Sequence, residues 1–139
     1  MEQSYDVIVL GAGNAGMAPA GMAKEAGKSV LVIDGRDFGG TCALRGCVPK
    51  KVLVAAGEAL NIIQDASEHK IDASFNTIDW PALIERKQTF VEGVPQMFED
   101  SLTGRNIDIA HGAAKFTGAN QIQVNGATVL GGQFVIATG

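Results

Sequence analysis

The sequence lacks the features that would assign the protein to a membrane or to nucleic acid. None of its apolar runs approaches the roughly 20 residues that a membrane-spanning helix needs. The opening residues Glu2, Gln3 and Ser4 are acidic or polar, unlike the start of a secretory signal. The net charge of −4 comes without any block of like charges. We therefore expect a soluble, cytoplasmic domain that binds neither membrane nor nucleic acid.

Cysteine and histidine are also scarce. The chain has only Cys42 and Cys47, together with His69 and His111. The distant histidines do not complete a zinc site with the cysteines, so we expect no metal centre. Without a secretory signal, two closely spaced cysteines indicate a redox pair. A structural disulfide and two unrelated buried thiols remain as alternatives.

Glycine and apolar residues, by contrast, are plentiful. Hydrophobic residues make up 46% of the 139 positions, which is enough for one domain with a core of its own. The 18 glycines indicate many tight turns and close backbone approaches.

The first 34 residues have the pattern of a βαβ unit. Residues 5–10 (YDVIVL) and 29–33 (SVLVI) each predict a short strand buried on both faces. Between them, residues 14–25 predict a helix, in which Pro19 and Gly21 should cause a bend or a tight first turn. The crossover should be right-handed, so we expect an α/β fold with a parallel, Rossmann-like sheet.

The middle of the chain is expected to be mostly helical. Residues 48–67 predict a helix, and residues 68–77 predict a loop. A second helix should begin at Asp79 as its N-cap and run toward Leu102, with a kink or a break near Gly93. In the first helix, apolar residues recur at spacings of three and four, which predicts one buried face. They are Val52, Ala55, Ala56, Ala59, Leu60 and Ile63.

From residue 107 onward the period changes toward that of strands. Residues 107–116, 121–124 and 127–130 are short segments separated by turns that contain glycine. The pair Asn125-Gly126 between apolar runs is a strong hairpin signal. We expect a three-stranded antiparallel meander, followed by a strand over residues 133–137 that rejoins the main sheet.

A glycine motif lies between the first predicted strand and the first helix. Gly11, Gly13 and Gly16 match G-x-G-x-x-G, in which the glycines allow a tight turn and a close approach of pyrophosphate to the helix N-terminus. Asp34 ends the next predicted strand, where a carboxylate can accept hydrogen bonds from ribose. Together these features predict a dinucleotide site.

The spacing of the two cysteines sets a condition for their pairing. Along a regular helix, residues five apart have Cα atoms about 8–9 Å apart, whereas a disulfide needs about 4.4–6.8 Å. Cys42 and Cys47 can therefore pair only if the segment is distorted, and Gly46 gives that freedom. Pro49 then favours a new helix, whose N-terminus would stabilise the thiolate of Cys47.

These motifs together resemble those of the class I pyridine nucleotide–disulfide oxidoreductases, which include glutathione reductase, dihydrolipoamide dehydrogenase and mercuric reductase. The likeness rests on Gly39-Gly40-Thr41-Cys42, on Gly46-Cys47-Val48-Pro49-Lys50-Lys51, and on the strand that ends in Ala137-Thr138-Gly139. It implies an FAD-binding domain that passes electrons from NADH or NADPH through FAD to the Cys42–Cys47 disulfide. A small-molecule disulfide or a similar substrate would then be reduced.

The resemblance also implies residue roles in cofactor binding. The glycine turn would cradle the FAD pyrophosphate, Asp34 would hold the adenosine ribose, and the backbone of Ala114 would meet the adenine. Thr41 and Cys42 would line the flavin side of the cofactor. The remaining cofactor positions are Gly11, Gly13, Asn14, Ala15 and Gly16 in the turn, and Thr138 and Gly139 closing over the cofactor.

Three catalytic roles follow from the same resemblance. Cys47 would be the charge-transfer thiol beside the flavin, and Cys42 would attack the substrate. Lys50 or Lys51 would approach flavin N5 and favour the negative charge of the reduced flavin. The sequence departs from the family pattern at Leu44, at Arg45 and at Asp34.

The same resemblance bears on domain organisation. We expect residues 1–139 to be the N-terminal part of an FAD domain, without the nicotinamide-binding and dimer-interface domains and inactive by itself. A full-length protein would be a homodimer. The alternative is a non-enzymatic dinucleotide-binding or interaction module.

The other conspicuous side chains are expected to have no catalytic role. His69 should be solvated and His111 structural, and Trp80 and Phe90 should pack in the core or between helices. The acidic residues of the second helix should form a solvated face: Glu85, Glu92, Glu99 and Asp100.

Overall fold

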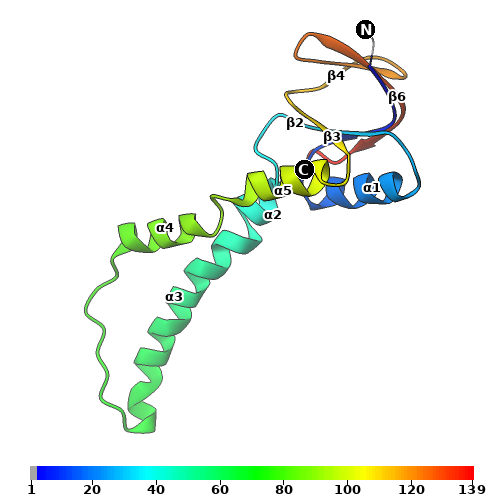
Figure 1. Cartoon of the computed structure of the whole chain (residues 1–139). Coiled ribbons are helices and arrows are strands. Elements are labelled where there is room, and N and C mark those ends of the chain that lie inside the picture. Colours follow the sequence, from blue (N-terminus) through cyan, green and yellow to red (C-terminus); the bar gives the residue numbers. More distant parts are fainter. Residues whose placement is uncertain (1–2) are drawn as a thin grey trace.

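The computed structural model describes residues 3–139 and has an α/β fold built on one six-stranded sheet (Figure 1). The strands are β1 Gln3–Leu10, β2 Val30–Asp34, β3 Asp108–His111, β4 Lys115–Gly118, β5 Gln121–Val124 and β6 Ala127–Ile136. The helices are α1 Asn14–Glu25, α2 Gly40–Leu44, α3 Cys47–Asp65, α4 Trp80–Thr89 and α5 Val94–Thr103, with a 3-10 turn, η1, at Ala66–His69. The predicted fold class is thereby confirmed.

The sheet combines a parallel half and an antiparallel half. Its strand order is β3-β2-β1-β6-β5-β4, in which β3, β2, β1 and β6 run parallel and β6, β5 and β4 run antiparallel. The predicted βαβ unit is present as β1, α1 and β2, and α1 continues through Pro19 as a single helix. Because the parallel strands end together, their carboxyl ends form one edge at which a ligand site can lie.

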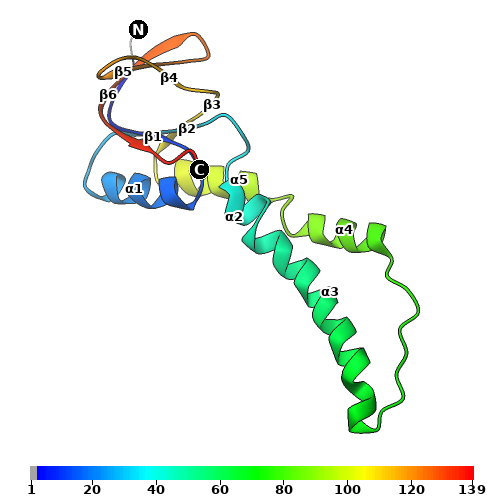
Figure 2. The same cartoon turned by 180° about the vertical axis from the view of Figure 1, so that it is seen from behind.

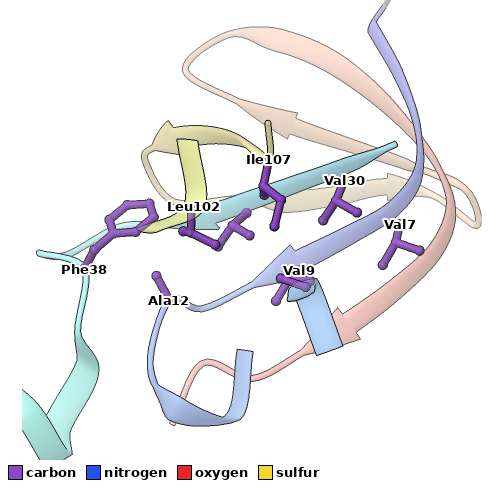
Figure 3. Packing of buried hydrophobic residues seen from close by; sticks show 9 residues of the cluster. Val7, Val9, Ala12, Val30, Phe38, Leu102 and Ile107 are labelled. Atoms are coloured by element: carbon purple, nitrogen blue, oxygen red, sulfur yellow. The ribbon is translucent and has the colours of Figure 1, made fainter. Parts of the chain in front are cut away.

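The core lies on both faces of the parallel strands. Alternate residues of β1 point to opposite sides of the sheet, as strand geometry requires. Val7 and Val9 pack with Phe38, Leu102 and Ile107 on the side covered by α1 and α5 (Figure 3). On the other side, Ile8 and Leu10 of β1 pack under the meander with Ile122, Val124 and Val129 of β5 and β6. Burial on both faces explains the continuous apolar runs of β1 and β2.

The antiparallel meander differs from the expected one in its strand boundaries. Residues 107–116 were predicted as one strand but form two: β3 pairs with β2 in the parallel sheet, and β4 begins the meander. The chain leaves the parallel ladder at Gly112, whose amide donates to the carbonyl of Asp34 at 2.8 Å. The segments 127–130 and 133–137, predicted as separate strands, are one strand, because β6 stays paired with β1 across Gly131. The Asn125-Gly126 hairpin is confirmed, with φ angles of 50° and 80°.

Helices α3 and α4 form an arm that projects away from the sheet (Figures 1 and 2). The arm comprises residues 47–90. The predicted buried face of α3 is only half-buried, and Pro49 alone is fully buried among the helix residues. Of the predicted face, Ala55 and Ala59 are exposed, and the half-buried residues are Val52, Ala56, Leu60 and Ile63. Trp80, predicted to pack in the core or between helices, is 55% exposed, whereas Phe90, 47% exposed, borders the groove between α3 and α4. Within the described residues, α4 is the helix that lies along α3, and it leaves the apolar face of α3 only partly covered.

The second predicted helix is confirmed in its start and in its break. The carboxylate of Asp79 accepts a hydrogen bond from the amide of Ala82 at 3.0 Å, as an N-cap should. The chain then turns over residues 90–93, and α5 begins at Val94, directly after Gly93. This break returns the chain from the arm to the sheet, where Leu102 of α5 is buried against β1 and β2.

Candidate functional site

The carboxyl ends of the parallel strands open onto two adjoining cavities, of about 500 and 200 Å³. Asp34 at the end of β2 borders both cavities, as do Thr41 before the disulfide and Thr138 after β6. Because the cavities share these residues, we describe them as one groove, with a larger end and a smaller end. The larger end is lined by Gly11 and Ala114, and the smaller end by Gly13, Asn14, Ala15 and Cys42.

The glycine turn is in close backbone contact with its surroundings. Gly11 has φ of +111°, and a Cβ at this position would collide with the carbonyl oxygen of Ala137. A Cβ on Gly40 would lie 2.7 Å from the Cα of Gly13. The turn therefore touches both the end of β6 and the start of the disulfide segment, and side chains at these glycines would separate them.

The N-terminus of α1 offers free hydrogen-bond donors to the smaller end of the groove. In residues 3–139, the amides of Asn14 and Ala15 donate to no protein acceptor, whereas Gly16 and Met17 donate to the carbonyl of Gly13. The first turn of α1 contains no acidic side chain. Free amides and the helix dipole together favour an anion such as a phosphate.

Asp34 has a second task that the sequence did not reveal. One carboxylate oxygen accepts the amide of Ala12 at 2.8 Å, and the other accepts the amide of Arg36 at 2.9 Å. Asp34 therefore ties the glycine turn to the end of β2. Asp34 also borders the groove, as the expected contact with ribose requires. That contact itself stays a prediction.

Cys42 and Cys47 form a disulfide at the smaller end of the groove. Their Cα atoms are 4.7 Å apart, within the range that disulfides need. The helical path is interrupted between α2 and α3 at Arg45 and Gly46, which confirms the predicted distortion. Two unrelated thiols are therefore excluded, and α3 begins at Cys47 as the thiolate argument requires.

Comparison with known proteins agrees with this geometry. The sequence profile of the family described as "Pyridine nucleotide-disulphide oxidoreductase" matches residues 5–139. The chain belongs to this family.

Relatives within the family carry different names. The chain is 36% identical over 139 residues to mercuric reductase of Lysinibacillus sphaericus, covering 99% of this chain and 26% of that protein. It is 33% identical over 135 residues to glutathione reductase of Burkholderia cepacia, covering 97% and 30%. It is 31% identical over 142 residues to dihydrolipoyl dehydrogenase of Chlamydia pneumoniae, covering 100% and 31%. The chain thus spans between a quarter and a third of the length of these relatives.

In this family member the two lysines after the disulfide lie in different surroundings. Lys51 borders a groove between α3 and α4, together with Arg86 and Phe90. Lys50 is exposed on α3 and does not border that groove. Of the predicted site residues, four do not line the strand-end groove: Gly16, Cys47, Lys50 and Lys51. Every other predicted cofactor residue does line it.

The structure adds residues that sequence reasoning did not place in the site. Arg36 borders both ends of the groove, and Arg45 borders the smaller end. Arg45 was noticed only as a departure from the family pattern. The sequence offered one signal for each, namely its position beside a predicted site residue. Arg36 lies two residues after Asp34, and Arg45 lies between the two cysteines.

The two histidines have different surroundings. His69 lies at the exposed far end of the arm, in η1. The ring of His111 packs against buried Phe38, with 4.8 Å between ring centroids, and its Nε2 lies 3.2 Å from a carboxylate oxygen of Glu99. His111 thus joins α5 to the segment that leads into the disulfide. Within residues 3–139, no helix is long and apolar enough to span a bilayer.

Proposed function

We propose that this chain provides the FAD-binding and disulfide half of an FAD-dependent disulfide oxidoreductase. The observation that carries the proposal is the contact between the Cys42–Cys47 segment and the glycine turn, in which Cys42 borders the same cavity as Asn14 and Ala15. A dinucleotide bound there would lie beside the disulfide. Electrons from a nicotinamide cofactor would pass through FAD to Cys42–Cys47 and then to a substrate.

The residues present fit FAD in two respects. The free amides of Asn14 and Ala15 suit its diphosphate. The larger end of the groove, lined by Asp34 and Ala114, has about 500 Å³ for the adenosine. When bound, FAD would supply the two-electron chemistry that amino acid side chains lack. The protein's part is to hold it, with Thr41, Thr138 and the glycine turn, against the disulfide.

The two cysteines are given different roles. Once the disulfide is reduced, Cys47 at the N-terminus of α3 would be the more easily ionised thiol, because the helix dipole stabilises its thiolate. Cys42 would be the thiol that attacks the substrate. Lys50 is preferred over Lys51 as the cation beside the flavin, because Lys51 faces α4.

The rest of the reaction needs parts beyond this groove. The curated relatives are longer than this chain, which covers 26–31% of their lengths. We propose that an NADH- or NADPH-binding domain and a dimer-interface domain complete the enzyme, which would act as a homodimer on a small-molecule disulfide or a similar substrate.

Spectroscopy of the purified protein tests this proposal. FAD should bind and give a flavin absorbance spectrum, and anaerobic two-electron reduction should produce a long-wavelength thiolate–flavin band. Cys47→Ser should abolish that band, whereas the matched variant Cys42→Ser should retain it without any reductant. A protein that binds no flavin, or a band that survives in Cys47→Ser, would contradict the proposal.

A second candidate is a non-enzymatic dinucleotide-binding or interaction module. The exposed apolar side chains of the arm favour it, among them Ile62 at 71% and Ile71 at 59% exposure. This function requires FAD or ADP binding without any reaction between flavin and disulfide. Bound FAD whose reduction leaves Cys42 and Cys47 oxidised would support it over the first proposal.

A further inference from the structure

Arg45 occupies an unusual position for a cation in this fold. It lies in the four-residue stretch between the disulfide cysteines, directly after α2, and its amide donates to the carbonyl of Thr41 at 2.9 Å. Arg45 borders the smaller end of the groove, which the N-terminal residues Asn14 and Ala15 of α1 also line. A single cavity is therefore bordered both by residues with free backbone amides and by an arginine.

The charges around this cavity leave Arg45 available to an anion. Among the described residues, Arg45 takes part in no salt bridge; the pair that is present joins His111 to Glu99. The acidic side chain among the residues that line the cavity is that of Asp34, and it already accepts two backbone amides. A guanidinium group binds phosphate through two parallel hydrogen bonds, which suits it to a diphosphate.

Arg36 also borders this cavity, but its position differs. Its amide is held by Asp34, and it borders the larger end of the groove as well, where the nucleoside would lie. Arg45 borders the smaller end alone. The arginine in the disulfide loop is thus the one confined to the diphosphate end.

We propose that Arg45 binds the diphosphate of the dinucleotide and so anchors the cofactor from the disulfide loop. This inference rests on the proposed function, because it assumes a dinucleotide in the groove. It adds a side-chain cation to a diphosphate site otherwise made of backbone amides, and it places that cation between Cys42 and Cys47. The cofactor would then be held by the same loop that it reduces.

The test compares ligands that share adenosine but differ in phosphate. Binding of FAD, ADP and adenosine to the protein would be measured by calorimetry for wild type, Arg45→Gln and Arg45→Lys. Loss of a charge-assisted pair should weaken FAD and ADP binding by about 10- to 100-fold in Arg45→Gln. Adenosine binding should stay unchanged, and Arg45→Lys should recover part of the loss. The wild-type affinity for ADP should also fall more steeply with salt than that of Arg45→Gln.

Arg86→Gln provides a matched control, since it removes the same charge from the arm, where Arg86 lies over the ring of Phe90. It should leave all three affinities unchanged. Equal ADP affinities for wild type and Arg45→Gln would overturn the role of Arg45 and leave the dinucleotide site intact. A similar loss for adenosine would overturn it too, because a general distortion would then explain the effect. Wild-type protein that binds neither FAD nor ADP would overturn the proposed function itself, and this inference with it.

Discussion

Tyr5 joins two strands that are not neighbours in the sheet. Its hydroxyl donates to a carboxylate oxygen of Asp108 at 2.7 Å, from β1 across β2 to the start of β3. Burial raises the pKa of Tyr5 from 10.0 to about 12, and the hydrogen bond and the negative charge of Asp108 act in the same direction. The folded protein therefore keeps the Tyr5 proton at a pH where the unfolded chain has lost it.

A dependence of stability on alkaline pH follows from Tyr5. Because the folded pKa is the higher one, the contribution of Tyr5 is complete below pH 10 and is lost as the pH rises to about 12. Tyr5→Phe should cost about 1 kcal/mol at neutral pH, where the hydrogen bond is lost, and its stability should fall less between pH 10 and pH 12. Urea unfolding of both proteins across this range measures the difference. Since Tyr5 is the only tyrosine, tyrosinate absorbance gives its pKa directly, and a midpoint near 10 would contradict the argument.

Single residues of the site differ in how far the sequence could predict them. The positions of the glycine turn between β1 and α1 and of Asp34 at the end of β2 are confirmed, because they follow from the order of strand, turn, helix and strand. The hydrogen bonds of Asp34 to backbone amides were not foreseen, since they depend on the length of its side chain and the path of the turn. Arg36 and Arg45 were missed as groove residues because they border the site from loops, whose paths no periodic pattern fixes.

At the scale of elements, the break between α2 and α3 decides whether the cysteines can meet. The break falls at Gly46, where an added Cβ would lie 3.0 Å from the carbonyl oxygen of Thr41. That oxygen already accepts the amide of Arg45. The closed loop therefore has little room for a side chain at this glycine.

Gly46→Ala should destabilise the protein more when the Cys42–Cys47 loop is closed by the disulfide than when the cysteines are reduced. Displacing the Thr41 carbonyl should cost the oxidised protein about 1–3 kcal/mol, while the reduced protein can relax and should lose less. Equilibration with glutathione redox buffers should therefore show a larger reduced fraction than in wild type. Gly57→Ala is the control, because Gly57 lies within α3 and an added Cβ there meets nothing within 4 Å. It should stabilise the protein by up to about 1 kcal/mol without changing the redox equilibrium. Equal redox shifts in both variants would refute the steric argument.

Helices were easier to predict than their surroundings. The apolar spacing of α3 identified the helix, and the Asp79 cap and the Gly93 break were also correct. The predicted burial of the apolar face of α3 was met only in part, because periodicity shows which face is apolar but not what covers it. The three-stranded antiparallel meander was predicted correctly, as β4, β5 and β6, but the boundary between β3 and β4 was not. The apolar pattern runs on from β3 to β4, although the two strands pair with different partners.

The molecule as a whole consists of two regions that differ in how much apolar surface they bury. The sheet, α1 and α5 enclose buried clusters on both sides of the parallel strands. The arm of residues 47–90 packs mainly against itself and leaves several large apolar residues exposed, including Ile62 and Trp80. Regions with few buried contacts open locally at low free-energy cost, so the arm should exchange its amide hydrogens faster than the strands.

Cofactor binding should increase the difference in amide hydrogen exchange between these two regions. The groove is built from the ends of β1, β2 and β6 and from the disulfide segment, so FAD should slow exchange at residues 11–16, 34–36 and 137–139. At 100 times its Kd, FAD should also raise the free energy of unfolding by about 2.7 kcal/mol. Residues of α4 touch no part of the groove and should exchange at the same rate with and without FAD. Hydrogen exchange followed by mass spectrometry, with adenosine as the control ligand, measures each region separately. Protection of α4 equal to that of the glycine turn would show that arm and sheet unfold as one unit and would contradict this division.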